Sequence, residues 1–165
     1  MPPDPVILEK LKEKFPTEIV STNDSGEMPV AVIKKAEGHS ILSFMKEEPA
    51  LRFDFLIDLT AIDRQKLGGT PRFEVVYHLY SVTLKHRLRL KIQLPEEDLR
   101  LASAVDLWKS ANWMERECAE MFGILFEGHP NPKKLLLFEG FEGYPLRKDY
   151  PIDRRQKIPV PEEKL

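Results

Sequence analysis

The chain has 165 residues, 25 of them Lys or Arg and 27 Asp or Glu, which gives a formal net charge of −2 at pH 7. This near balance provides no global field to attract nucleic acid or anionic lipid. The length suits one domain that needs no disulfide or metal for stability. No apolar run approaches the roughly 18 residues of a membrane-spanning helix. The single cysteine, Cys118, excludes an internal disulfide and an iron–sulfur cluster held by this chain alone. Because Met1 to Pro5 has the features of neither a signal peptide nor a basic transit peptide, we expect a cytoplasmic location.

Two helices and a loop are predicted in the first part of the chain. Apolar residues at helical spacing predict an amphipathic helix over 5–15 and a second helix over 39–48, which Pro49 closes. Residues 21–29 are rich in turn-forming residues and are expected to form a loop.

Short strands are predicted over 30–33 and over 53–62, which is rich in β-branched and aromatic residues. Alternating apolar residues predict two more strands, over 73–82 and 87–94. The last of these is the clearest, because four apolar side chains alternate with Arg87, Arg89, Lys91 and Gln93. The connections within 53–94 are too short for parallel crossovers and predict an antiparallel meander. The fold class is therefore α+β in two layers, with helices packed on one face of a mostly antiparallel sheet. We expect an α+β domain over 1–125 and an extended C-terminal arm over 126–165.

Two capping boxes are expected after the meander. Ser103 would cap a short helix through Trp108, with Asp106 at the third position. Asn112 would cap the next helix, with Glu115 at its third position.

The helix predicted over 113–122 carries an apolar stripe, formed by Met114, Cys118, Met121 and Phe122. Cys118 is accordingly expected to be a small buried side chain and not a nucleophile, and Gly123 a left-handed stop. Arg116 and Glu120 are four residues apart and can pair. For Glu115, Arg116 and Glu117 two interpretations stay open. The two acids face water, or the three residues lie at an inter-subunit contact or brace the arm through buried ion pairs.

The four histidines lack a carboxylate or thiol at the spacing of a metal site; they are His39, His78, His86 and His129. His78 and His86 are expected to face each other on neighbouring strands. His129 lies between Gly128 and Pro130, where it is expected to hydrogen-bond the backbone of a turn. Neither a phosphate-binding glycine pattern nor a Gly-x-Ser-x-Gly elbow is present.

The basic stripe of Arg87, Arg89 and Lys91 could bind RNA on a sheet. No aromatic residue alternates with these charges. The stripe is therefore more typical of a solvated sheet face.

The prolines at 145 and 151 favour an extended backbone between them. In this segment Leu146 and Tyr150 are expected to be apolar anchors. Arg147 would pair with Asp149 or reach a partner. The large apolar residues of the arm argue against disorder, so the arm is interpreted as a docking segment.

Four blocks share an order and spacing with one family: Trp113-x-Glu115-Arg116-Glu117, Phe122-Gly123-Ile124, 126–130 and 143–151. They resemble the signature of the thirty-kilodalton subunit, or C subunit, of respiratory complex I, the proton-translocating NADH:quinone oxidoreductase. Segments 53–63 and 73–79 are also similar, and the resemblance covers about residues 5 to 155. The motif residues that it marks as partner-facing are Glu115, Arg116, Glu117, Gly123, Phe126, Gly128, His129, Pro130, Pro145, Leu146, Arg147, Lys148, Asp149 and Tyr150.

The chain departs from the family pattern at two places. The family usually has an aromatic residue and an Asp where this chain has Ala119 and Glu120, and a Leu and an Arg where it has Pro132 and Lys133. A lysine cannot replace a bidentate arginine contact.

The resemblance implies a subunit of an enzyme complex with no catalytic residue, cofactor or metal of its own. FMN, iron–sulfur clusters and quinone would belong to other subunits. The partners would be a D-like quinone-site subunit and the cluster-bearing B-like and I-like subunits. Nucleic acid would not be a partner, and membrane contact would come only through the complex. The location would be peripheral, on the cytoplasmic face of the cell inner membrane.

Three alternatives remain at this point. The chain could be the equivalent subunit of a ferredoxin-linked or reduced-deazaflavin-linked quinone reductase, or of a membrane-bound hydrogenase. It could be an RNA-binding α+β module. It could be a separate hydrolase or transferase that uses His129 with Glu127 or Glu117.

Overall fold

The structure, a computed structural model, describes residues 5–24 and 26–158. The expectation for the N-terminal sequence concerns residues that, apart from Pro5, lie outside this range, as do residues 159–165 of the arm. The helices are α1 (Pro5–Lys14), α2 (Gly38–Glu47), the short 3-10 helix η1 (Gln65–Leu67) and α3 (Ala111–Phe122). The strands are β1 (Ile19–Asn23), β2 (Val30–Lys34), β3 (Phe55–Asp63), β4 (Phe73–Tyr80), β5 (Arg87–Leu94), β6 (Arg100–Ala102) and β7 (Leu125–Glu127).

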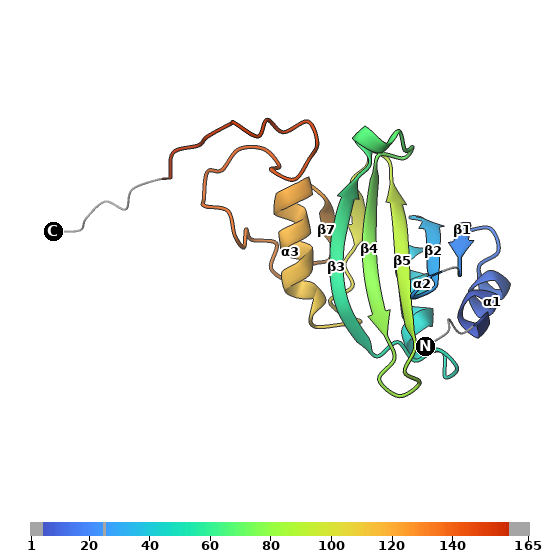
Figure 1. Cartoon of the computed structure of the whole chain (residues 1–165). Coiled ribbons are helices and arrows are strands. Elements are labelled where there is room, and N and C mark those ends of the chain that lie inside the picture. Colours follow the sequence, from blue (N-terminus) through green and yellow to red (C-terminus); the bar gives the residue numbers. More distant parts are fainter. Residues whose placement is uncertain (1–4, 25, 159–165) are drawn as a thin grey trace.

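The main sheet has the strand order β1-β2-β5-β4-β3 (Figure 1). Strands β3, β4 and β5 form the antiparallel meander that their short connections predict. Strand β2 pairs with β5 in parallel, and β1 closes the far edge antiparallel to β2. Strands β6 and β7 form a separate parallel pair. The sheet is therefore mixed, with antiparallel pairing in the majority.

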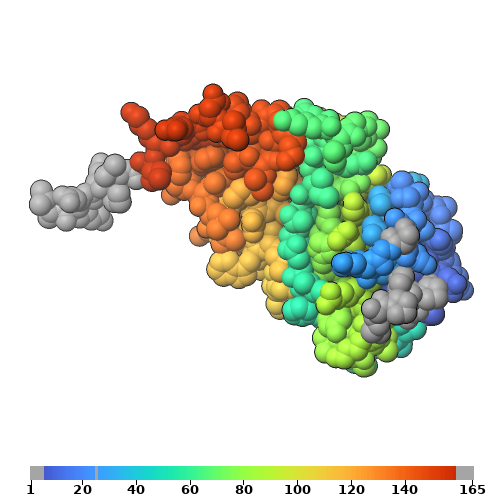
Figure 2. All heavy atoms as spheres, in the orientation of Figure 1, coloured from blue at the N-terminus to red at the C-terminus, as the bar shows by residue number. Residues whose placement is uncertain are grey.

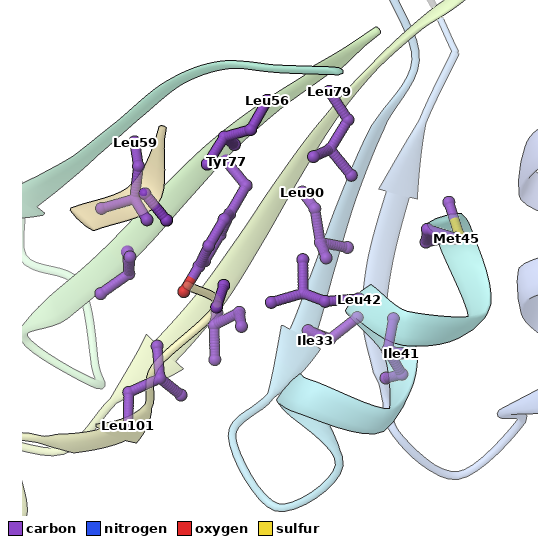
Figure 3. Close-up of a cluster of buried hydrophobic side chains, with 14 of the residues drawn as sticks. Ile33, Ile41, Leu42, Met45, Leu56, Leu59, Tyr77, Leu79, Leu90 and Leu101 are labelled. Atoms are coloured by element: carbon purple, nitrogen blue, oxygen red, sulfur yellow. The ribbon is translucent and has the colours of Figure 1, made fainter. Parts of the chain in front are cut away.

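One face of the sheet carries the hydrophobic core. Leu88, Leu90, Ile92 and Leu94 of β5 are all fully buried, as the alternation predicts. Side chains from α1, α2 and α3 join them in one cluster, so the helices lie on this face. Figure 3 shows Ile41 and Leu42 of α2 approaching Ile33 and Leu90 of the sheet, with Tyr77 extending between its apolar neighbours. The prediction of an α+β fold with helices on one face is confirmed.

The prediction of a loop over 21–29 is wrong for its first three residues. Ser21, Thr22 and Asn23 belong to β1 and pair with Val32, Ala31 and Val30. The side chains of Ser21 and Asn23 favour turns when considered alone. Pairing with β2 satisfies their backbone groups instead, and this gain depends on tertiary structure.

Both predicted capping boxes are also wrong. The chain forms turns between Ser103 and Trp108, where no helix is present. Helix α3 begins at Ala111, after Ser110, whose side chain makes no capping hydrogen bond. The second box fails because Glu115 turns into the core and binds the backbone and side chain of the 103–104 segment, so it cannot serve the first turn of its own helix.

Candidate functional site

After β7 the described part of the arm contains no helix or strand. The prediction of an extended backbone between Pro145 and Pro151 is wrong, because residues 145–149 form turns, in which the N–H groups of Arg147 and Tyr150 donate to carbonyl oxygens three residues earlier. Figure 2 shows the described part of the arm as an orange-to-red layer against α3 and the end of β3 and β4. Strand β7 spans the boundary expected between residues 125 and 126, and the division into two parts stays a prediction. Four polar contacts hold residues 133–149 of the arm on the domain.

The first contact is made by Glu120 of α3. Its carboxylate accepts hydrogen bonds from three consecutive main-chain N–H groups, those of Leu135, Leu136 and Leu137, at 3.0, 2.8 and 3.1 Å. Hydrogen bonds to a charged acceptor are stronger than neutral ones, and this carboxylate is buried. Glu120 therefore shapes the arm over 135–137.

The second contact is made by Arg116, one turn earlier on α3. Its guanidinium donates to the carbonyl oxygens of Lys133 and Lys134 at 2.7 and 2.9 Å and lies over the ring of Trp113. Arg116 and Glu120 thus bind carbonyls and amides of one arm segment. The predicted pairing of Arg116 with Glu120 is replaced by these contacts.

The third contact closes the C-terminal end of α3. Arg147 donates from Nε to the carbonyl oxygen of Phe122 at 2.7 Å, and its guanidinium stacks on the rings of Tyr144 and Phe73. The N–H of Leu146 donates to the carbonyl oxygen of Met121. A cation here complements the partial negative charge of a helix C-terminus. Gly123, the predicted left-handed stop, has φ +76 and ends the helix.

The fourth contact joins the arm to the C-terminal end of β3 and the start of β4. Arg72 binds Asp63 through Nε and Nη2 at 3.0 and 2.7 Å, and its Nη2 lies 3.0 Å from Asp149. The N–H of Lys148 donates to the same Asp63 carboxylate at 2.8 Å. Asp149 therefore pairs with Arg72 and Arg147 with Phe122. Arg147 and Asp149 therefore do not pair with each other, which was one of the two alternatives predicted for Arg147.

Opposing effects set the pKa of Asp63. Burial by itself raises it, whereas the hydrogen bonds from Arg72 and from the N–H groups of Lys148 and Gln65 lower it. The hydrogen bonds outweigh burial, so the pKa of Asp63 lies well below its usual range.

A buried polar cluster surrounds Glu115 at the base of α3. Its carboxylate accepts from the hydroxyl of Ser103 and from the N–H of Ala104, both at 2.6 Å. His129 Nε2 lies 4.0 Å from Glu115 and 2.9 Å from the carbonyl oxygen of Asn112. Burial raises the pKa of Glu115 despite the hydrogen bonds and the neighbouring His129.

The hydroxyl of Tyr77 is buried without a hydrogen-bond partner in the described chain. Burial, and then the charge of Glu115, raise its pKa.

His129 hydrogen-bonds the backbone of its turn, as predicted, because its Nδ1 accepts from the N–H of Asn131. The predicted facing of His78 and His86 is wrong. His78 accepts from Arg89 and lies 3.5 Å from Asp58, whereas His86 precedes β5 and contacts the carbonyl oxygen of Leu51. The hairpin turn keeps His86 off the strand face that His78 occupies.

Cys118 is buried on α3, as its stripe predicts, with Sγ 3.9 Å from the carbonyl oxygen of Leu59. Burial raises the pKa of its thiol, which disfavours the reactive thiolate.

The remaining partner-facing candidates are spread around these contacts. Phe126 is buried, Pro145 and Tyr150 are partly buried, and Glu117, Gly128, Pro130, Leu146, Lys148 and Asp149 are exposed. Glu115 and Glu117 thus face opposite environments. Sequence reasoning missed the roles of Asp63 and Arg72. The only sequence signal for Asp63 was its place in segment 53–63, which is similar to the family. Arg72 follows a turn, and no local sequence pattern marks it.

Neither a metal centre nor an RNA-binding face is supported. Among the described residues no group of three or more His, Cys, Asp or Glu side chains could hold a metal ion. In the same part of the chain no helix is long and apolar enough to cross a membrane. On the sheet, Arg89 donates to His78 and Lys91 to Glu74, so the basic stripe is largely satisfied by its neighbours.

The fold and these contacts define an α+β domain with a C-terminal arm held on its last helix. Residues 31–156 match the family described as respiratory-chain NADH dehydrogenase, 30 Kd subunit. The chain belongs to this family.

Named relatives agree with this assignment. The chain is 44% identical over 151 residues to the NADH-quinone oxidoreductase C subunit of Citrifermentans bemidjiense, covering 91% of each chain. It is 40% identical over 161 residues to the protein of the same name from Burkholderia multivorans, covering 93% of this chain and 80% of that one.

Two solved structures share the fold. A trypsin-resistant fragment of Nqo5 is 33% identical with a TM-score of 0.67 and covers 76% of this chain and 96% of its own. A chain of the membrane-bound sulfane sulfur reductase, an archaeal respiratory membrane complex, is 27% identical with a TM-score of 0.71. That match covers 89% of this chain and 85% of the other.

Proposed function

We propose that this chain is a structural subunit of the hydrophilic arm of a proton-translocating NADH:quinone oxidoreductase. It binds no redox cofactor and supports electron transfer from NADH, through iron–sulfur clusters in other subunits, to quinone. The observation that carries this proposal is the match, over nearly the whole chain, to relatives that bear the name of the NADH-quinone oxidoreductase C subunit. These relatives favour it over the ferredoxin-linked, deazaflavin-linked and hydrogenase alternatives.

The arm is proposed to be the part that docks on partner subunits. Its contacts with α3 and Asp63 use mainly backbone groups of the arm. These contacts leave apolar side chains outward, since Leu136 and Leu146 are 62% and 48% exposed. An arm whose backbone is satisfied by its own domain, and whose large side chains remain accessible, is preorganised for a partner.

We propose the particular partners from the family resemblance. A D-like quinone-site subunit would receive the arm, with cluster-bearing B-like and I-like subunits beside the domain. The chain would then be peripheral, on the cytoplasmic face of the inner membrane, and would meet the membrane only through the complex. FMN, clusters and quinone would be held by those other subunits.

The experiment is deletion of residues 140–165 in the producing organism, followed by isolation of the complex. We expect the complex to lose this subunit and its quinone reductase activity. Normal assembly with normal activity would overturn the docking role of the arm. Arg147→Ala is the point version, and it should weaken assembly more than it lowers the stability of the isolated chain.

A further inference from the structure

A cavity of about 350 Å³ lies between α3 and the arm. Arg116, Ala119 and Glu120 line it on the helix side, and Lys133, Lys134 and Tyr144 on the arm side. The volume falls within the range of side-chain and small-ligand sites. The cavity has an opening to the surface, because Lys133, Lys134 and Tyr144 are exposed.

The cavity carries unbalanced positive charge. Arg116 and Lys134 donate to carbonyl oxygens of the arm, which are neutral. Lys133 has no side-chain hydrogen bond or ion pair within residues 5–24 and 26–158. Glu120 is the one acidic residue of the lining, and its oxygens already accept three amide hydrogens. Three cations therefore face the space without a free carboxylate.

The same contacts define what kind of anion fits. Successive main-chain N–H groups form the usual cradle for phosphate. Here the amides of 135–137 are directed to Glu120 and unavailable to a ligand. The remaining donors are a guanidinium and flexible ammonium groups beside the ring of Tyr144. Such donors suit the carboxylate of an Asp or Glu side chain brought in by a protein segment.

The geometry points to this cavity as the seat for an acidic side chain of a neighbouring subunit, with Arg116, Lys133 and Lys134 as its cationic contacts. This inference rests on the proposed function, because the acidic segment belongs to another protein of the same complex. It assigns to the arm a second role: its basic inner surface completes a binding site with α3, in addition to the outward apolar contacts.

A zero-length carbodiimide cross-link on the intact isolated complex tests the inference, since the reagent joins lysine ammonium groups to carboxylates in contact. Mass spectrometry is expected to find Lys133 or Lys134 joined to an Asp or Glu of another subunit. An intact complex in which these lysines form cross-links only within this chain, or none, overturns the inference. The proposed function would survive that result, because this chain would still be present in the complex.

Charge reversal gives a second, independent measurement. Lys133→Glu removes no contact made within the described chain, so folding should be unchanged. Retention in the complex should weaken about tenfold, and the variant should dissociate at a lower salt concentration than the unmodified chain. Lys133→Arg should restore retention. The matched control is Lys85→Glu, an exposed lysine in the β4–β5 turn, which is expected to leave retention unchanged. Equal retention of the Lys133→Glu variant and the unmodified chain overturns the inference.

Discussion

Arg147 donates from Nε to the main-chain oxygen of Phe122 at 2.7 Å, which joins the arm to the last carbonyls of α3. The contact requires a close approach at Gly123, the residue that follows Phe122. A Cβ at this position would lie 2.6 Å from Nη2 of Arg147 and 2.6 Å from Cζ of Tyr144. The end of the helix and the placement of the arm are therefore linked through one residue without a side chain.

Gly123→Ala should displace the arm as well as strain the helix end. A left-handed conformation costs a non-glycine residue about 1–2 kcal/mol, and the new methyl group must also move Arg147 and Tyr144. We expect lower stability in urea unfolding and faster proteolysis within 140–158. Gly140→Ala is the matched control, because Gly140 also has positive φ (+89) but open space around its Cβ position. If the two variants lose equal stability and resist protease equally, the close approach has no role in holding the arm.

Glu120→Gln should loosen the arm at residues 135–137 specifically. The amide side chain keeps one acceptor oxygen but turns an NH2 group toward backbone donors, and it loses the charge that strengthens the three hydrogen bonds. Hydrogen exchange of the N–H groups of Leu135, Leu136 and Leu137 should accelerate at least about tenfold, equivalent to about 1.4 kcal/mol. Glu117→Gln, an exposed neighbour on the same helix, should leave these exchange rates unchanged. Unchanged rates in Glu120→Gln would contradict the assignment.

Local patterns predicted what depends on local periodicity. The alternation from Arg87 to Leu94 predicted β5 to the residue, because the face of a strand follows directly from its sequence. The stripe on α3 predicted the burial of Cys118 for the same reason. Strands β6 and β7, three residues each, were missed because such short segments carry no period.

The contacts that position the arm could not be predicted from local sequence patterns. Asp63 and Lys148 are 85 positions apart, so neither sequence context indicates the other. Glu115 shows the limit most clearly. Its position suggested a capping box, yet the nearby Ser103 and Ala104 offer it two donors inside the core. Charged residues pair according to the tertiary fold, which their spacing alone does not specify.

Asp63→Asn should destabilise the protein at neutral pH, because the guanidinium of Arg72, whose side chain is 10% exposed, loses its bidentate partner and keeps only the exposed carboxylates of Asp149 and Glu96. Breaking a fully buried ion pair on one side costs about 3–5 kcal/mol, and the cost here should be smaller because two other carboxylates remain on Arg72. Because its pKa in the folded state is depressed, the wild-type carboxylate contributes stability above its unfolded pKa of about 3.9. That contribution is lost as the pH falls below this value. The difference in unfolding free energy between wild type and Asp63→Asn should therefore shrink below about pH 4.

The control for this pH series is Asp153→Asn, which changes an exposed carboxyl of the arm. Its unfolding free energy should follow that of the wild type at every pH. A difference between wild type and Asp63→Asn that stays constant down to pH 2 would show that ionisation of Asp63 does not stabilise the fold.

Glu115→Gln should produce a pH dependence of the opposite sign. The pKa of Glu115 is raised in the folded protein, chiefly by burial, while Asp106 acts in the same direction and Ser103, Ala104 and His129 oppose it. A raised folded pKa means that the stabilising contribution of the neutral carboxyl is present below the unfolded pKa of about 4.3 and is lost as the pH rises through the folded value. The neutral glutamine keeps an acceptor for the N–H of Ala104 and does not titrate. Measured by urea unfolding from pH 4 to 7, the stability of Glu115→Gln should therefore rise relative to that of the wild type.

Glu117→Gln serves as the exposed control and should show no such trend. A stability difference between wild type and Glu115→Gln that is independent of pH, or that moves in favour of the wild type, would mean that the ionised carboxylate is stabilised by its partners more than burial penalises it.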